Sequence, residues 1–248
     1  MPGIEPSTLP PPPPPDSFDS PLARVAGVFA SPGPTFAAIT RRPGWVLPLV
    51  ISTVLSLAAT AAIVPRIDIE AAVREGLAAR DQSIPEEKVE QIVSAQKKFG
   101  GFFAYVSGLL APTLITLLLA LVFWISFKAF GWEVTFRQSL GVTAHALLPA
   151  IGASMLLIFF ATRLDLINPS DIGDLTHSNP GFLVDRHANS VLHSLLGSVD
   201  LFSIWVFSLL VIGFAIAANV TRRKAAILIG SLWGIFVLGK AAWAAVFH

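Results

Sequence analysis

Long apolar runs alternate with polar segments along this chain. Four of the runs hold no charged residue and the fifth holds one lysine; they cover residues 45–64, 100–127, 138–162, 201–221 and 225–247. A helix rises about 1.5 Å per residue, so about 20 apolar residues cross a hydrocarbon core of about 30 Å. The pattern predicts an all-α polytopic membrane protein with five transmembrane helices, over about 45–64, 102–128, 138–161, 200–220 and 225–246.

Two segments precede the first predicted span. Residues 1–17 contain the run Pro10–Pro15 and are predicted to be a disordered, Pro-rich tail, with binding to a partner's aromatic groove as the alternative. Residues 18–44 are apolar at helical spacing and interrupted by prolines, which predicts an interfacial helical segment of two short helices. Ser31 is the expected N-cap of the second, and its apolar face is expected on the headgroup boundary. Residues 45–247 then form the membrane domain.

Two connections are long enough to carry structure of their own. In residues 66–99, Ser83–Glu86 has the form of a capping box, which predicts an amphipathic helix over 86–99 that stops at Gly100-Gly101. Residues 163–198 contain turn signals, with one more short helix expected over 187–196. The second apolar run is 28 residues long, so we expect it to tilt, to kink at Pro112 or to begin in the interface.

Composition and charge narrow the class of protein. The chain is 54% hydrophobic and only 13% charged, with a net charge of +1, which fits a lipid environment and leaves no basic face for nucleic acid. It has no cysteine, and no cleavable signal peptide is recognised at its N-terminus. The bases of Arg41-Arg42 and Arg222–Lys224 lie densely beside spans, so the positive-inside rule predicts a cytoplasmic N-terminus and an outside C-terminus.

Four polar or helix-breaking residues in or beside the spans are candidate sites: His145, Pro149, Asp200 and Lys240. His145 and Pro149 lie one turn apart, and a helix break near a proline can bind a substrate or a proton; the alternative is a kinked packing helix whose histidine bonds a neighbouring group. No charged partner for His145 is evident at its depth. Asp200 is expected at a helix start, facing the positive end of the dipole, and Lys240 is expected to reach the nearer headgroups.

No catalytic residue, cofactor or metal site is predicted. The loop between the third and fourth spans holds three histidines and four aspartates, but no two of the histidines have i, i+4 spacing, so we interpret it as a solvated polar loop: His177, His187, His193, Asp165, Asp171, Asp174 and Asp185. Ser154 and His145 lie nine residues apart on one predicted helix, about 13 Å along its axis, and cannot pair directly. The protein is therefore expected not to be an enzyme.

Three stretches of this sequence resemble the bacterial branch of the Yip1 family of small integral membrane proteins. They are Phe29–Phe36 with Ile39 and Pro43–Trp45, then Gly141–Pro149, and finally Val199–Trp205 with Gly213-Phe214. The resemblance covers about residues 22–247 and implies five spans in the bacterial inner membrane. Eukaryotic members of this family are trafficking factors that contact Rab-type GTPases and one another, through a tail that is here short and Pro-rich.

Two functions remain open at this point. The leading hypothesis is a non-enzymatic membrane organiser or adaptor, whose partners are membrane lipids and other membrane proteins or further copies of itself. The alternative is a small transporter or permease subunit that uses the helix break at His145–Pro149, and a membrane-bound enzyme is a third and weaker class. A water-accessible cavity that reaches His145 would favour the transporter, and a tightly packed centre would favour the organiser.

Overall fold

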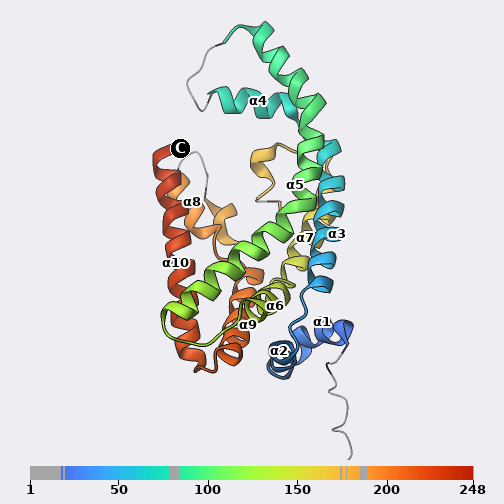
Figure 1. The fold of residues 1–248 in the computed structure, drawn as a ribbon. Helices are drawn as coiled ribbons and strands as arrows, with labels where there is room; N and C mark the ends of the chain where they lie inside the picture. Colours follow the sequence, from blue (N-terminus) through green and yellow to red (C-terminus); the bar gives the residue numbers. More distant parts are fainter. Residues whose placement is uncertain are drawn as a thin grey trace, which may run out of the picture.

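The computed structural model describes residues 18, 20–78, 84–173, 175–176, 178–184 and 189–247. In these residues the chain forms ten α-helices and no strand (Figure 1). They are α1 Pro21–Ala30, α2 Pro32–Arg41, α3 Val46–Ile63, α4 Ile69–Ala78, α5 Glu86–Ala129, α6 Phe136–Ala146, α7 Ala150–Ala161, α8 Ser190–Leu196, α9 Leu201–Ala217 and α10 Arg222–Phe247. Three short 3-10 turns occur as well, at Val64–Arg66, Pro169–Asp171 and Pro180–Leu183. The predicted tail, residues 1–17, lies outside the described residues.

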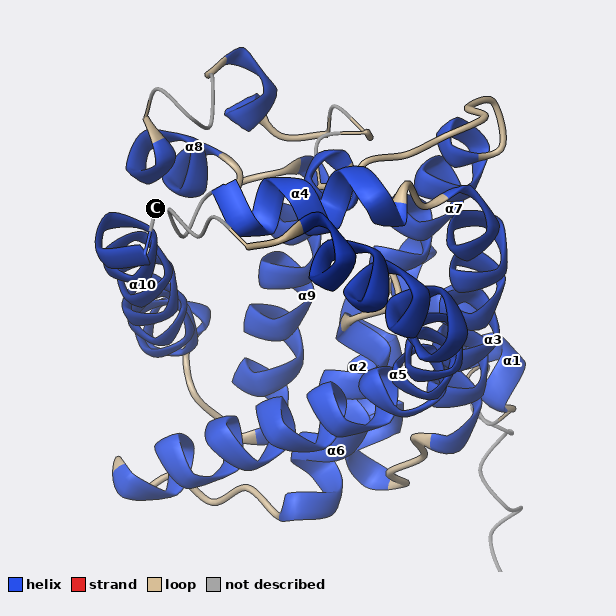
Figure 2. Ribbon diagram, turned by 90° about the horizontal axis from the view of Figure 1, so that it is seen from above, coloured by secondary structure: helices blue, strands red, loops and turns tan. Residues whose placement is uncertain are grey.

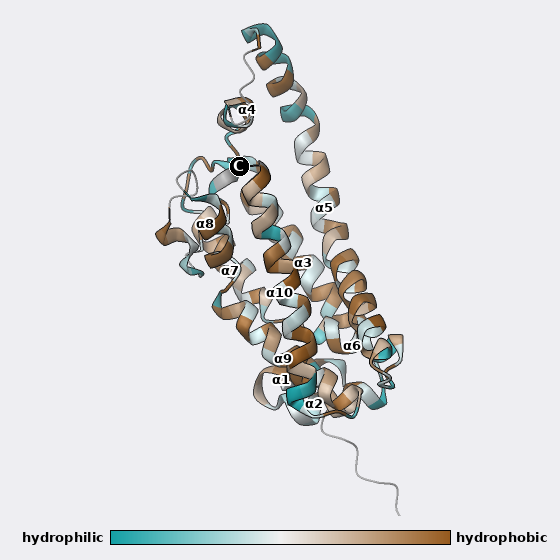
Figure 3. Ribbon diagram, turned by 90° about the vertical axis from the view of Figure 1, so that its left-hand side faces the viewer, coloured by the Kyte–Doolittle hydropathy of each residue, from teal (hydrophilic) through white to brown (hydrophobic). Residues whose placement is uncertain are grey.

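The all-α membrane fold is confirmed. Four spans are long and apolar enough to cross a membrane, and they contain α3, α5, α6 with α7, and α10. A fifth arises if α8 and α9, which meet at a bend of 52°, count as one span. Hydrophobic residues cover the length of these helices and hydrophilic residues gather at their ends (Figure 3). Seen along the bundle, α9 lies between α10 on one side and the group of α3, α5 and α7 on the other (Figure 2).

The two helices of the N-terminal segment form a hairpin under the bundle. Ser20 caps α1 by accepting a hydrogen bond from the amide of Ala23, and α2 begins after Ser31 with Pro32 as its first residue, as expected, although the Ser31 side chain does not cap it. For α2, the expected place of the apolar face was wrong. Phe36 and Ile39 are completely buried against the bundle, because α2 packs on α6 and α9 and the protein core competes with the headgroup boundary for this face.

Helix α5 is much longer than predicted, since the expected stop at Gly100-Gly101 does not occur. The helix runs for 44 residues, from Glu86 through both glycines and Pro112 to Ala129. A glycine in a helix interior costs only about 1 kcal/mol relative to alanine, so two glycines do not by themselves end a long apolar helix. The proposed cap residue Ser83 lies outside the described residues.

The N-terminal part of α5 and helix α4 form a hairpin that projects beyond the bundle (Figure 1). The two helices pack through a small apolar cluster, and the buried members of that cluster are Val73, Val89 and Val93. The base of α4 is attached to the connection after α7, because the amide of Asp68 donates to the Ile167 carbonyl at 2.9 Å and the amide of Ile167 donates to the Arg66 carbonyl at 2.7 Å. Helix α4 was not anticipated from the sequence.

Candidate functional site

Three helices from distant parts of the sequence, α2, α6 and α9, meet at the end of the bundle where α1 and α2 lie (Figure 1). We call this contact the α2–α6–α9 junction and define it by Phe36, Ile39, Val142, Gly213 and Phe214. All of its side chains are fully buried. The Phe214 ring also stacks on Phe127 of α5, with 4.8 Å between the ring centroids, so the junction is continuous with the main core.

Glycines allow the three backbones to approach one another in this junction. A Cβ added at Gly213 would lie 2.5 Å from Val142 Cγ1 and 3.0 Å from Phe36 Cδ1. A Cβ added at Gly141 would lie 3.1 Å from Ile39 Cγ2. Small residues at such positions are the usual means of close helix packing in lipid.

His145 is buried beside this junction, with 2% of its surface exposed. Its Nδ1 lies 2.8 Å from the carbonyl oxygen of Gly141, one turn earlier in α6. Because a carbonyl oxygen only accepts, Nδ1 must carry the proton and donate it. The imidazole is therefore bonded to its own helix, as in the packing alternative.

Arg24 is the charged neighbour of His145 that sequence reasoning missed. It lies on α1, is only 6% exposed, and α1 contacts α6, the helix that carries His145. Its guanidinium donates from Nε to the Phe18 carbonyl at 2.8 Å and from Nη1 to the Arg42 carbonyl at 2.7 Å. These two bonds close the α1–α2 hairpin. The signal in the sequence was the i, i+4 spacing of Arg24 and Val28, which places a charge on the apolar face of a short helix.

The third span is interrupted between α6 and α7, at residues 147–149. The amide of Leu148 donates to the His145 carbonyl at 3.2 Å, and the amide of Ala150 donates to the Leu147 carbonyl at 3.0 Å, in the tighter i to i+3 pattern. Pro149 is buried in this turn and has no N–H to continue the α-helical ladder. The break thus satisfies its backbone groups locally.

Asp200 is the N-cap of α9. Its Oδ1 accepts a hydrogen bond from the amide of Ser203 at 2.8 Å, and the amide of Asp200 donates to Ser203 Oγ at 2.9 Å. This reciprocal pair is a capping box, and it places the carboxylate at the positive end of the helix dipole. The local structure of the α9 start accounts for the residue type at this position.

Lys240 is exposed and bonds the segment that precedes α9. Its Nζ lies on α10 and donates to Ser198 Oγ at 3.2 Å, in the connection between α8 and α9. Lys240 and Asp200 thus both serve the start of α9, whereas His145 lies on α6 beside α1. The structure does not gather the candidate residues into a single site.

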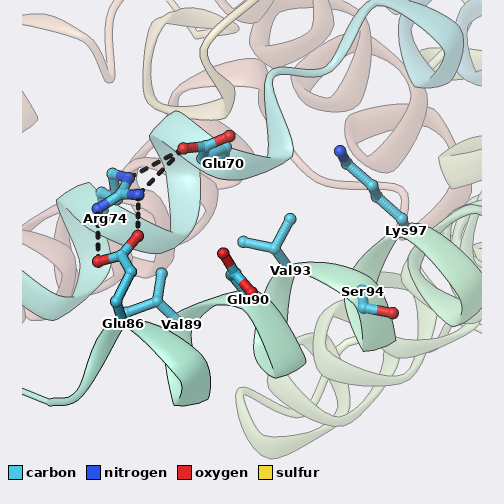
Figure 4. A pocket seen from close by; sticks show the side chains of 8 residues that line it. All are labelled: Glu70, Arg74, Glu86, Val89, Glu90, Val93, Ser94 and Lys97. Carbon is cyan, nitrogen blue, oxygen red and sulfur yellow. Dashed lines mark hydrogen bonds and ion pairs between the residues drawn. The ribbon is translucent and has the colours of Figure 1, made fainter.

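A cavity of about 390 Å³ lies between α4 and the N-terminal part of α5, outside the apolar part of the bundle. Figure 4 shows Arg74 bonded to both Glu70 and Glu86 at one end of this cavity and Lys97 at the other. Hydrogen bonds and charges from Glu86 and then Glu70 raise the pKa of Arg74 above its ordinary value, so the guanidinium remains charged. This ion-pair network joins the two arms of the hairpin.

A second cavity, of about 260 Å³, lies within the bundle between α3, α5 and α7. Leu147 and Ala150, on either side of Pro149, contribute to its wall, but His145 does not. In the part of the chain that is described, no group of three or more metal-binding side chains comes together. His177, His187, Asp174 and Asp185 of the polar loop lie outside the described residues.

The sequence model of the Yip1 domain family matches residues 26–243, which is most of the chain. The chain belongs to the Yip1 family. It is also similar to "Membrane protein YknW" of Bacillus subtilis (strain 168), with 26% identity over 218 residues that cover 86% of each chain. No solved structure matches it.

The stretches that carry the Yip1 resemblance lie together in space. Phe36 and Ile39 come from the first stretch, Gly141 opens the second, and Gly213 and Phe214 belong to the third; all meet in or beside the α2–α6–α9 junction. The first and third also meet through an edge-to-face contact, with 5.4 Å between the ring centroids of Phe29 and Trp205. In this Yip1 protein these residues therefore build the contact that holds the N-terminal hairpin against the membrane helices.

Proposed function

We propose that this Yip1-family protein is a non-enzymatic membrane organiser or adaptor that presents its N-terminal hairpin to partners. One observation carries the proposal: the family-like residues form the junction that fixes α1 and α2 against the bundle, with Phe36 and Ile39 fully buried. A docked hairpin is a rigid platform at one membrane surface, and rigid presentation lowers the entropic cost of binding. Membrane lipids and other membrane proteins, or copies of the same chain, are the partners that suit it.

The transporter alternative is less well supported. A transport site at the break would need a path to His145, yet the His145 side chain is 2% exposed, bonds the Gly141 carbonyl and lines neither cavity. Transport pathways usually contain several ionisable groups with access to water. The surroundings of His145 favour a packing role.

The exposed apolar surface of α1 suggests a test by crosslinking and pull-down from native membranes. Leu22 on α1 is 71% exposed, and Leu183 at the other end of the molecule is 72% exposed, so Leu22→Glu and Leu183→Glu are matched surface changes. A further variant lacks residues 1–17 only, because removing the chain through residue 43 would also take Phe36 and Ile39 from the core. A defined partner is expected with the intact protein and with Leu183→Glu, and its loss is expected with Leu22→Glu.

The outcomes separate the two functions. Recovery of the same partner from the intact protein and from both glutamate variants would show that the partner does not bind through α1. Recovery of the protein alone from every sample would count against an adaptor, and solute flux through reconstituted vesicles would then be measured. The variant that lacks residues 1–17 tells whether the Pro-rich tail contributes.

We also propose that the protein lies in the cell's inner membrane with the α1–α2 end in the cytoplasm. Eight of the described bases lie at that end, and seven lie toward the opposite end; the eight are Arg24, Arg41, Arg42, Lys128, Arg137, Arg222, Arg223 and Lys224. Of the described acids, Glu133 alone lies there, and the others lie at the opposite end: Asp68, Glu70, Glu75, Glu86, Glu87, Glu90, Asp165, Asp171 and Asp200. The bases at the α1–α2 end are also the denser ones, because Arg41-Arg42 precedes α3 directly and Arg222–Lys224 fills one short connection. The positive-inside rule associates such dense bases beside spans with a cytoplasmic face.

The absence of cysteine from the sequence makes this orientation easy to test. Thr221→Cys and Gly173→Cys place single exposed thiols at the two ends of the molecule. A membrane-impermeant maleimide added to intact cells should label Gly173→Cys and label Thr221→Cys only after the membrane is opened. The reverse pattern would invert the proposed topology.

A further inference from the structure

The cavity between α3, α5 and α7 lies at the mid-length of three membrane spans. Ser52 and Ser56 come from the centre of the span Val46–Arg66, and Leu147 comes from the centre of the span Phe136–Ala161. Pro112 stands near the middle of the charge-free part of α5. Three spans thus each contribute their midpoint to one cavity of about 260 Å³.

Two of these midpoints are places where a proline stands in the helix. Pro112 lies inside α5, and Pro149 lies in the break between α6 and α7, next to the lining residues Leu147 and Ala150. Proline has no N–H and its ring displaces the preceding turn, so helices separate slightly at such points. Irregular backbone at membrane depth is tolerated where it is buried in protein or lines a cavity. The prolines therefore account for the presence of space here.

The wall of the cavity is mostly apolar, and its polar groups are uncharged hydroxyls. Four hydroxyl residues line it, Ser52, Ser56, Thr116 and Ser154, and none of its lining residues is charged. The Thr116 hydroxyl donates to the Pro112 carbonyl at 2.7 Å, and the Ser154 hydroxyl donates to the Ala150 carbonyl at 3.2 Å. Among the described residues, the hydroxyls of Ser52 and Ser56 have no hydrogen-bond partner. A hydroxyl without a partner costs free energy in hydrocarbon, so these two are available donors.

We propose that this cavity binds an uncharged lipophilic molecule whose compact head carries carbonyl acceptors, of which a quinone ring is the type. Because the wall has no charged residue, an ionic headgroup would find no opposite charge there. The mid-membrane depth suits a molecule that dissolves in the bilayer centre, and the unpartnered donors of Ser52 and Ser56 suit carbonyl oxygens. The volume holds a single ring or head, and its apolar tail lies along the lipid-exposed face of α5, where Ile115 forms the rim and is 52% exposed.

The test uses the full chain in lipid nanodiscs and a photoreactive azido-benzoquinone with a decyl tail as the probe. Labelled peptides are identified by mass spectrometry. Saturable labelling of α3, α5 or α7 is expected, with competition from decylubiquinone and none from dodecane. Removing both hydroxyls in Ser52→Ala/Ser56→Ala should reduce labelling at a subsaturating probe concentration by at least about fivefold, from the loss of two donors.

Two further variants keep the test decisive. Ala111→Leu fills the cavity from α5 and should abolish labelling. Ser208→Ala is the control: it removes an intramembrane hydroxyl from α9, outside the cavity, and should leave labelling unchanged. All variants are compared at equal thermal stability, and Ser52→Ala alone replaces the double variant if that does not fold. Unsaturable labelling, equal labelling of the wild type and the serine variants, competition by dodecane, or a cavity that holds water only would each overturn the proposal.

Discussion

Gly213 on α9 faces Val142 on α6 so closely that an added Cβ would lie 2.5 Å from Val142 Cγ1. Phe36 of α2 closes the other side of the same point, at 3.0 Å. One glycine therefore sets the distance among three helices of the junction. Since interiors packed to crystal-like density do not absorb an extra methyl without movement, the consequences are measurable.

Gly213→Ala should destabilise the protein by about 1–3 kcal/mol, the usual cost of overpacking a dense core. The free energy of unfolding in detergent is the measurement. Gly234→Ala is the matched control, because nothing lies within 4 Å of its added Cβ and alanine is the better helix former. Val142→Ala combined with Gly213→Ala should recover part of the loss. Equal stability of Gly213→Ala and Gly234→Ala would mean that the junction is not closely packed.

Arg24→Met should loosen the α1–α2 hairpin while keeping most of the apolar volume of the side chain. The change leaves the carbonyls of Phe18 and Arg42 without their donor, at a cost of about 1–3 kcal/mol for each group that stays unpaired. Trypsin should then cleave the Arg41–Arg42 bond faster in the purified protein. Arg223→Ala, an exposed arginine on α10, serves as the control, and an unchanged cleavage rate in Arg24→Met would contradict the hairpin-closing role.

His145→Ala should lower the free energy of unfolding by about 1–3 kcal/mol, since it removes the bond to the Gly141 carbonyl and leaves a cavity in a packed region. Thermal unfolding and solute flux in vesicles should be measured on the same preparation. Normal stability together with a loss of flux would instead favour the transporter.

Asp200→Ala should weaken the start of α9 by about 1 kcal/mol, whereas Asp200→Asn should be close to the wild type, because asparagine is an equally good N-cap. Hydrogen exchange is the suitable measurement, with faster exchange of the Ser203 amide expected in Asp200→Ala alone. If Asp200→Asn proved as harmful as Asp200→Ala, the carboxylate charge would be needed for something other than capping.

The sequence predicted the positions of the helices better than it predicted what the faces of the helices pack against. Apolar runs define helices in lipid because every backbone group must bond within its own segment, so α3, α10 and the third span fall close to the predicted ranges. The expected stop at Gly100-Gly101, inside α5, was wrong because glycine is a weak stop signal. The face of α2 was misplaced because an amphipathic pattern shows that a face is buried without showing what buries it.

The candidate residues also divide into those whose role follows from local sequence and those whose role depends on distant contacts. The cap at Asp200 follows from local chemistry within four residues, and its position at a helix start could be read from the chain. Arg24 and His145 lie about 120 positions apart in the sequence, and no spacing rule connects them. The cavity likewise needs the midpoints of three separate spans, so it was not foreseen.

By itself, the sequence determined that the helices lie in lipid, that the fold is all-α, and approximately where the spans are. These properties depend on composition and on short-range backbone bonding. Only the tertiary structure decided that α2 enters the core and that Gly141 and Gly213 bring helices together. It also decided that serines of α3 line a cavity with Pro112 of α5 and with the break in the third span. Those features depend on contacts between distant segments. Lipid does not drive helices together as water does, so their arrangement comes from close packing and a few hydrogen bonds, which no single segment encodes.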